Sequence, residues 1–143
     1  MEKLNDLEVA KAKLLSSNLN LVIVKEGRII FESRRRGILG FIEAIDSLGP
    51  SLKGTTVADR IVGRAIALLC LYAGVGSLYA LTLSREGKEV LEQSGIYYTW
   101  EHMVDNILSP DGMDICPFEK ISQGINNPVE AYKKFREMLE RSL

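Results

Sequence analysis

The chain has 143 residues, which is the usual size of a single folded domain. Hydrophobic residues make up 46% of it and charged residues 26%, so it can bury a core without disulfides or metals. With 18 basic and 19 acidic residues the net charge is −1, which argues against nucleic acid or an acidic membrane as a partner.

The cysteines and the N-terminal segment predict the cellular compartment. Cys70 and Cys116 are the two cysteines and lie far apart, which is typical of reduced thiols in the cytoplasm. Residues 1–15 are charged throughout and contain no apolar signal core. The longest apolar stretch, 65–75, is too short to span a bilayer. We therefore expect a cytoplasmic protein without a membrane anchor.

Hydrophobic spacing predicts the first elements of the chain. Apolar residues three and four apart indicate a helix over 2–16. Two runs rich in branched residues, 19–25 and 28–33, predict strands, and the Glu-Gly pair between them predicts a β-hairpin. A short amphipathic helix is expected over 40–49.

A long helix is predicted over 57–73, because this segment is apolar on nearly all sides. Thr56 and Asp59 loosely match a capping box at its start. Gly63 lies inside the predicted helix and implies that another backbone approaches closely. Such a helix is expected to be central and covered on more than one side.

The second half of the chain predicts a strand over 77–83, a helix that Ser84 caps, and a strand over 96–100. The next segment, 101–108, is expected to form a short helix. The last two predicted helices cover 117–124 and 128–142.

This element order predicts one α/β domain over 1–143, with a C-terminal helix at 128–142. Strands that alternate with helices after a hairpin indicate three layers, helix/mixed sheet/helix. The strand-helix-strand unit at 77–100 is expected to be parallel with a right-handed crossover.

Three segments resemble a known family. They are "DRIVGRAIALL" (59–69), "LYALTLSREGKEVLEQSGI" (78–96) and "DICPFEK" (114–120). Together they resemble a prokaryotic domain family of unknown function with a cytidine-deaminase-like fold, and the Cys-Pro-x-Glu stretch is the most recognisable part. The resemblance covers roughly residues 19–124 and implies that these residues form the core of the domain. The resemblance implies that fold, and it implies almost no biochemistry.

The zinc site of the deaminases is not expected in this chain. Zinc deaminases have H-x-E or C-x-E at the start of the buried helix, and P-C-x-x-C at the start of the next. The matching segments here are "TTVADR" and "LSREGK", which contain neither histidine nor cysteine, and the one histidine, His102, falls in a later element. We therefore predict no bound metal, no other cofactor and no zinc-dependent deamination.

A ligand site is expected where helices start beyond the carboxyl ends of the parallel strands. Thr55, Thr56, Asp59 and Ser84 are the candidates, and free N–H groups at helix starts favour a small anionic or nucleotide-like ligand. Asp59 has a second interpretation as a charge that stabilises the first turn of a helix. Arg64 could bind an anion or pair with an acidic residue.

Cys116 has two interpretations, which the sequence leaves open. It could be a thiol of lowered pKa at a helix start, acting with Glu119 in a thiol-dependent enzyme. It could equally be a small cap before Pro117, with Glu119 stabilising the first turn.

Three functions therefore remain as hypotheses. The first is binding of a small anionic or nucleotide-like molecule by a deaminase-like domain. The second is a non-catalytic oligomerisation or regulatory module, for which Tyr97, Tyr98 and Trp100 could form the subunit contact of a homo-oligomer. The third is an enzyme that depends on Cys116.

Overall fold

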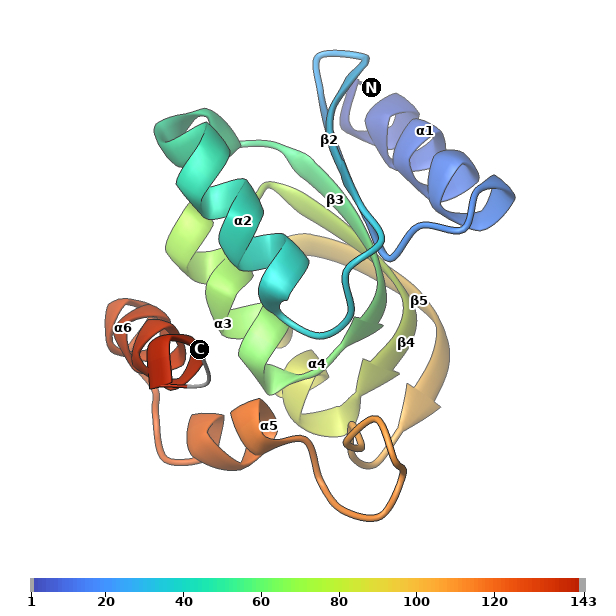
Figure 1. Ribbon diagram of the computed structural model, residues 1–143. Coiled ribbons are helices and arrows are strands. Elements are labelled where there is room, and N and C mark those ends of the chain that lie inside the picture. Colours follow the sequence, from blue (N-terminus) through green and yellow to red (C-terminus); the bar gives the residue numbers. More distant parts are fainter. Residues whose placement is uncertain (1, 142–143) are drawn as a thin grey trace.

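The computed structural model describes residues 2–141 and consists of a five-stranded sheet with helices on both faces (Figure 1). The strand order is β2-β1-β3-β4-β5. The strands are β1 (Leu21–Lys25), β2 (Arg28–Ser33), β3 (Thr56–Val62), β4 (Ser77–Ser84) and β5 (Tyr97–Val104). The α-helices are α1 (Glu2–Ser16), α2 (Leu39–Leu48), α3 (Arg64–Ala73), α4 (Arg85–Glu92), α5 (Pro117–Ser122) and α6 (Pro128–Arg141), and η1 (Gly49–Leu52) is a 3-10 turn.

The sheet is mixed, as the element order predicted. β1 is antiparallel to both of its neighbours, β2 and β3, while β3, β4 and β5 run parallel. The hairpin turn has positive φ at both central residues, 50° at Glu26 and 80° at Gly27, as a type I′ turn requires. The parallel pairing of β4 with β5 confirms the predicted strand-helix-strand unit.

Both faces of the sheet are covered, which explains why most residues of β1, β3 and β4 are buried. On one face α1 contributes Leu7, Ala10 and Leu14 to a small cluster with β1, β3 and β4. On the other face α2, α3 and α6 build the main core. In β1 the even-numbered Val22 and Val24 belong to the first cluster, and Leu21 and Ile23 belong to the second.

The predicted helix over 57–73 is wrong in its first third. Residues 56–62 form the central strand β3, and α3 begins only at Arg64. An apolar run that is buried on both faces of a sheet has no alternating pattern, and periodicity cannot distinguish it from a buried helix. Gly63 is consequently the cap of α3 rather than a residue of its interior, with extended φ and ψ of −106° and −167°.

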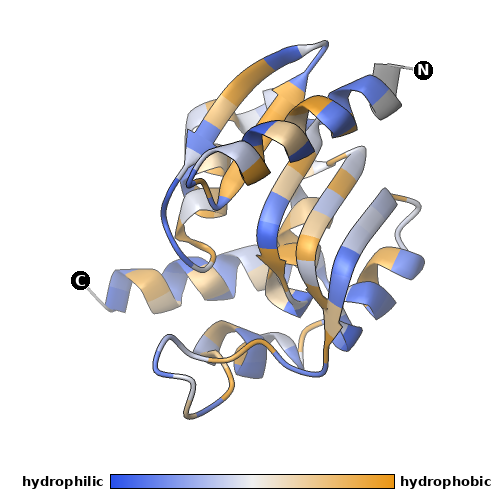
Figure 2. Ribbon diagram, turned by 90° about the vertical axis from the view of Figure 1, so that its right-hand side faces the viewer, coloured by the Kyte–Doolittle hydropathy of each residue, from blue (hydrophilic) through white to orange (hydrophobic). Residues whose placement is uncertain are grey.

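The predicted helix over 101–108 is also wrong, because β5 continues to Val104 and a loop follows. β5 is an edge strand of which one side lacks a neighbouring strand in the described chain. Its ribbon is paler and bluer in Figure 2 than those of the inner strands, because polar residues occupy both of its faces. This composition hides the apolar alternation by which a strand is normally recognised.

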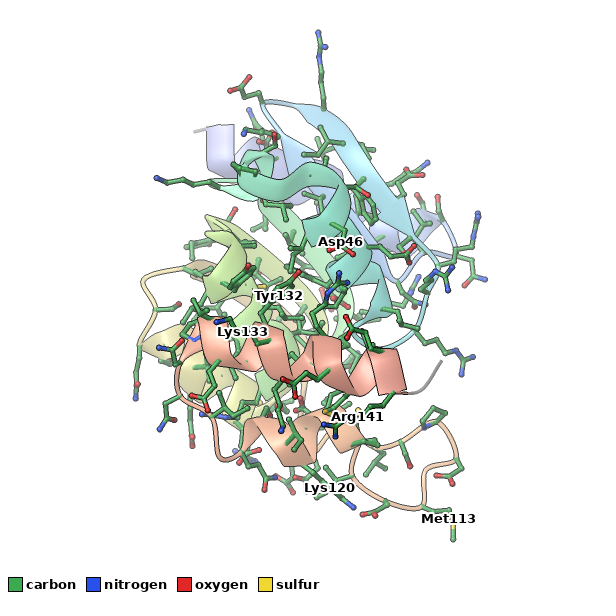
Figure 3. The ribbon with its side chains drawn as sticks, turned by 60° about the vertical axis from the view of Figure 1, so that its left-hand side comes forward. Asp46, Met113, Lys120, Tyr132, Lys133 and Arg141 are labelled. Atoms are coloured by element: carbon green, nitrogen blue, oxygen red, sulfur yellow. The ribbon has the colours of Figure 1, made fainter. Side chains whose placement is uncertain are left out.

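The C-terminal helix α6 belongs to the main core. Its Ala131 and Phe135 are fully buried, and the ring of Tyr132 stacks on Tyr72 of α3 with centroids 4.3 Å apart. Figure 3 shows α6 beside α2, where Arg136 forms a 2.8 Å ion pair with Asp46. Residues beyond 124 therefore contribute to the main core.

Candidate functional site

The start of α3 is capped by a carboxylate from a distant part of the chain. Glu119 of α5 accepts hydrogen bonds from the backbone N–H groups of Arg64, at 2.8 Å, and Ala65, at 2.7 Å. Its side chain is 5% exposed. These N–H groups have no partner within the helix, so the carboxylate satisfies both of them and faces the positive end of the helix dipole.

The side chain of Arg64 stabilises the same contact between α3 and the α5 segment, with α3 now supplying the side chain. Its guanidinium donates to the backbone oxygens of Ser122 and Ile125, both at 2.8 Å, and to the side-chain oxygen of Asn126 at 2.9 Å. All three acceptors are neutral. α3 and the segment 119–126 are thus joined by five hydrogen bonds that involve Glu119 and Arg64.

Gly63 is required by this arrangement. A Cβ atom at this position would overlap the carboxylate of Glu119 and would lie 2.7 Å from a side-chain carbon of Ile107. Gly87, in the first turn of α4, is also packed closely, because a Cβ there would lie 3.0 Å from the carbonyl of Gly63. The starts of α3, α4 and α5 therefore converge at the carboxyl ends of β3 and β4.

Burial raises the pKa of Glu119, and the backbone N–H groups of Ala65 and Arg64 oppose that shift. The nearby carboxylate of Glu86 raises the pKa further, while the charge of Arg64 lowers it. The position at the start of α3 that would suit an external anion is therefore filled by the chain's own carboxylate.

Cys116 is the cap residue of α5, as predicted, but its sulfur makes no hydrogen bond to that helix. The side chain is half-buried, and the backbone N–H donates to the carbonyl of Ile107 at 2.9 Å. Both carboxylate oxygens of Glu119 accept hydrogen bonds from the backbone of α3, and not from the Cys116 thiol. The pairing of Cys116 with Glu119 as a catalytic unit stays a prediction.

The four residues predicted to bind a ligand do not share one site. Thr55 donates its hydroxyl to the carbonyl of Leu52 at 2.7 Å, and Thr56 shares a 2.7 Å hydrogen bond with Ser77. These two threonines lie at the amino ends of the parallel strands, whereas Ser84 lies at the carboxyl end of β4. The placement before a helix was wrong for Thr55 and Thr56 because residues 56–62 form a strand.

Ser84 has the capping role that the sequence predicted. Its side-chain oxygen accepts a 3.0 Å hydrogen bond from the N–H of Gly87 in the first turn of α4. The hydroxyl is buried, and it satisfies the start of α4 from within the chain.

Asp59 lies inside β3 and not in the first turn of a helix. It is 7% exposed, and one carboxylate oxygen accepts a 3.2 Å hydrogen bond from the N–H of Ile61. Burial raises the pKa of Asp59 to about 8. Burial also raises the pKa of Cys70 in α3, and the charge of Asp59 adds to that shift.

His102 lies on β5, in register with Thr82 of β4, and is not itself at the start of a helix. Across residues 2–141 no three histidine, cysteine or acidic side chains are grouped closely enough to hold a metal ion. Within the same residues no helix is long and apolar enough to cross a bilayer.

A shallow cleft of about 350 Å³ lies between α3, α4 and the segment that follows α5. Its floor is apolar, from Leu68, Leu71 and Val90, and its rim is polar. The rim residues are Arg64, Glu89, Gln93 and Asn126. Of these the sequence pattern indicated only Arg64, which interrupts an apolar helix; Gln93 and Asn126 have no distinguishing pattern in the sequence.

The three layers, with a mixed sheet between helices, are those that the sequence predicted. The chain belongs to the family described as TM1506, domain of unknown function (DUF1893), whose model matches residues 9–139. Among curated proteins none matches the sequence significantly.

A crystal structure of a DUF1893 family protein (TM1506) from Thermotoga maritima is similar over 94% of this chain and 90% of its own, with 26% identity and a TM-score of 0.86. Two more distant structures share less. The dCMP deaminase of cyanophage S-TIM5 is 16% identical over 68% of this chain and 95% of its own, with a TM-score of 0.49. RibD of Acinetobacter baumannii is 19% identical over 87% of this chain and 36% of its own, also with a TM-score of 0.49.

Proposed function

We propose that this chain is a cytoplasmic, zinc-free binding protein whose ligand is a small anionic or nucleotide-like molecule, held in the cleft between α3 and α4. The observation that carries the proposal is the guanidinium of Arg64, which lines the cleft and whose three hydrogen-bond acceptors are all neutral. A guanidinium that keeps its positive charge beside an apolar floor suits an anionic group attached to a flat or apolar body.

The position of the cleft favours this site over the helix starts. Glu119 fills the start of α3 and Ser84 caps α4, so an anion there would have to displace groups of the chain itself. In the cleft, Gln93 and Asn126 add amide groups at the rim that can donate or accept hydrogen bonds. Glu89 on the same rim disfavours ligands of high negative charge.

Absence of zinc chemistry is part of the proposal and has its own support. The first turns of α2, α3 and α4 contain neither histidine nor cysteine. Elemental analysis of the purified protein tests this point, and one tightly held zinc ion per chain would refute it.

A thermal-shift screen against nucleoside monophosphates, inorganic phosphate and simple carboxylates tests the binding function. We expect at least one nucleotide-like compound to raise the melting temperature of the wild-type protein. Gln93→Trp, which fills the cleft from its exposed rim, should abolish the shift. Gln123→Trp is the matched control, because Gln123 is an equally exposed glutamine outside the cleft, and it should keep the shift. A ligand that binds both variants equally well would refute the cleft as the site.

A second function, a non-catalytic module that assembles with itself, is favoured by one further observation. β5 presents a free edge with exposed Tyr97 and Trp100. Catalysis by Cys116 is the third hypothesis, and it depends on the reactivity of that thiol, which the alkylation experiment in the Discussion measures.

A further inference from the structure

β5 has the features of a strand that pairs with another chain. It is eight residues long and forms one edge of the sheet, where Figure 1 shows it as the outermost strand. Its sequence, YYTWEHMV, contains no lysine and no proline, the residues that usually prevent pairing at an edge. Tyr97 is 49% exposed and Trp100 39% exposed.

The opposite edge of the sheet is protected in a way that β5 is not. β2 pairs with β1 through an irregular register near Ile23 and Val24, which twists the edge. β2 also begins with an arginine and runs into the basic segment 34–36. The irregular register and the basic residues disfavour pairing of a second strand with β2, so β5 is the edge of the sheet that is open to strand pairing.

We propose that two copies of this chain form a symmetric dimer by antiparallel pairing of β5 with the β5 of the second copy, which makes one continuous ten-stranded sheet. This inference rests on the assembly role named above and is independent of the cleft between α3 and α4. A second copy is the natural occupant because a strand paired with itself about a twofold axis needs only one self-complementary sequence.

The direction of the backbone groups limits the registers that are available. The N–H of Tyr97 donates to the carbonyl of Gly76, next to β4, at 3.4 Å. Backbone groups alternate in direction along a strand, so the odd-numbered residues of β5 face β4 and the even-numbered ones face outward. Tyr98, Trp100 and His102 therefore offer their N–H and C=O groups to a partner.

Charge disfavours one of these registers, and the proposed dimer has its axis at Trp100. With the axis at Trp100, Tyr98 lies opposite His102 of the second copy, and Trp100 lies opposite its own counterpart. On the other face Thr99 lies opposite Glu101 of the second copy. A shift that places the axis at Glu101 would bring two carboxylates directly opposite each other, which is destabilising. The register about Trp100 avoids this and joins the strands by about six backbone hydrogen bonds, two for each outward-facing pair.

The aromatic side chains near this axis are already stacked on each other within one chain. Tyr98 and Trp100 stack with centroids 5.8 Å apart and planes 22° apart. Nζ of Lys88 in α4 lies 5.6 Å from the centroid of Trp100, and Glu92 balances its charge at 2.8 Å. The axis thus passes through an aromatic pair whose neighbouring charges are compensated within each chain.

Sedimentation velocity of the full chain tests the dimer. We expect wild-type protein to sediment as two chains and His102→Pro to sediment as one, because proline removes an outward N–H group without breaking the ladder to β4. His102→Ala, which keeps that N–H group, should remain a dimer. Thermal melts of both variants show whether the monomer is still folded. Gln93→Trp should leave the dimer intact, so failure of the cleft and failure of this interface can be distinguished.

Cross-linking reads the register independently. In a Cys116→Ser background, whose remaining Cys70 is buried, a cysteine is placed in turn at Thr99, Trp100 or Glu101 and each variant is oxidised. Residues of a hydrogen-bonded antiparallel pair have Cα atoms about 5.5 Å apart, within disulfide range. We therefore expect a cross-linked dimer from Trp100→Cys and little from Thr99→Cys or Glu101→Cys. Wild-type protein that sediments as a single chain would overturn the proposal. So would a dimer that survives His102→Pro, or one that cross-links best through position 99 or 101.

Discussion

Removal of the Glu119 carboxylate is expected to loosen the contact between α3 and α5. Glu119→Ala deletes two hydrogen bonds, to the N–H groups of Arg64 and Ala65, and leaves both donors without a protein partner at a buried helix start. Hydrogen bonds to a charged group contribute about 1.5–3 kcal/mol each, and loss of a helix cap typically costs about 0.5–2 kcal/mol. Because burial opposes ionisation of Glu119, we place the net loss near the lower end, at about 3 kcal/mol.

Thermal unfolding followed by circular dichroism measures this loss. An unfolding entropy of about 2.1 cal/mol/K per residue corresponds to about 0.3 kcal/mol/K for this chain, so a loss of about 3 kcal/mol lowers the melting temperature by about 10 °C. Glu119→Gln keeps one acceptor oxygen, so its melting temperature should lie between those of the wild type and Glu119→Ala.

The matched control is Glu130→Ala, which removes an exposed glutamate from the first turn of α6. Its melting temperature should stay within about 3 °C of the wild type, because an exposed charge near a helix dipole contributes only about 0.3–1 kcal/mol. If Glu119→Ala changes the melting temperature as little as this control, the carboxylate does not stabilise α3 and the reasoning is wrong.

Three further predictions concern single side chains. Burial raises the pKa of Asp59 to about 8 in the folded protein from an ordinary value of 3.8, so folding retains a proton that the unfolded chain releases, and wild-type stability should fall as pH rises through that window. Asp59→Asn should therefore stabilise the protein at pH 8 by several kcal/mol, because each pH unit between the two pKa values costs the wild type up to about 1.4 kcal/mol. The same substitution should have little effect on stability near pH 4. Urea titrations in which the stabilities of both proteins change in parallel with pH would contradict this. Gly63→Ala should cost about 1–3 kcal/mol because a Cβ atom there overlaps the Glu119 carboxylate, and an unchanged denaturation midpoint would show that Glu119 moves aside freely. Burial raises the pKa of the Cys70 thiol, so alkylation mapped by peptide mass at neutral pH should label half-buried Cys116 well before Cys70; equal rates would remove the support for a thiol-dependent enzyme.

Local patterns in the sequence determined most of the secondary structure. The hairpin follows from two branched runs on either side of Glu26 and Gly27, and both of these residues adopt positive φ. Ser84 caps α4, Gly74 ends α3 with a left-handed φ of 73°, and Pro117 opens α5, as their residue types indicate. These features depend on neighbours within a few residues, which is the range that sequence patterns report.

The wrong secondary-structure predictions occurred where burial or exposure removes the alternation of apolar and polar residues by which a strand is recognised. β3 is largely buried on both faces, so its sequence lacks the alternation of a half-exposed strand. The first half of β5 was recognised as a strand, but its continuation begins with the exposed Glu101 and His102 and was predicted to be a helix. The position of each strand in the sheet causes both effects, one being central and the other an edge. A strand's neighbours are chosen by tertiary pairing, so a single-sequence pattern contains little information about them.

The candidate site was decided by tertiary structure for a related reason. The Cys-Pro-x-Glu stretch was recognisable in the sequence, but the role of its glutamate depends on a helix start 54 and 55 residues earlier in the chain. Arg64 was noticeable as a charge in an apolar run, yet its acceptors at 122–126 lie about as far away. A carboxylate and two free N–H groups attract each other wherever they occur. Only the folded chain, in which Gly63 leaves room for Glu119, brings these particular groups within hydrogen-bonding distance.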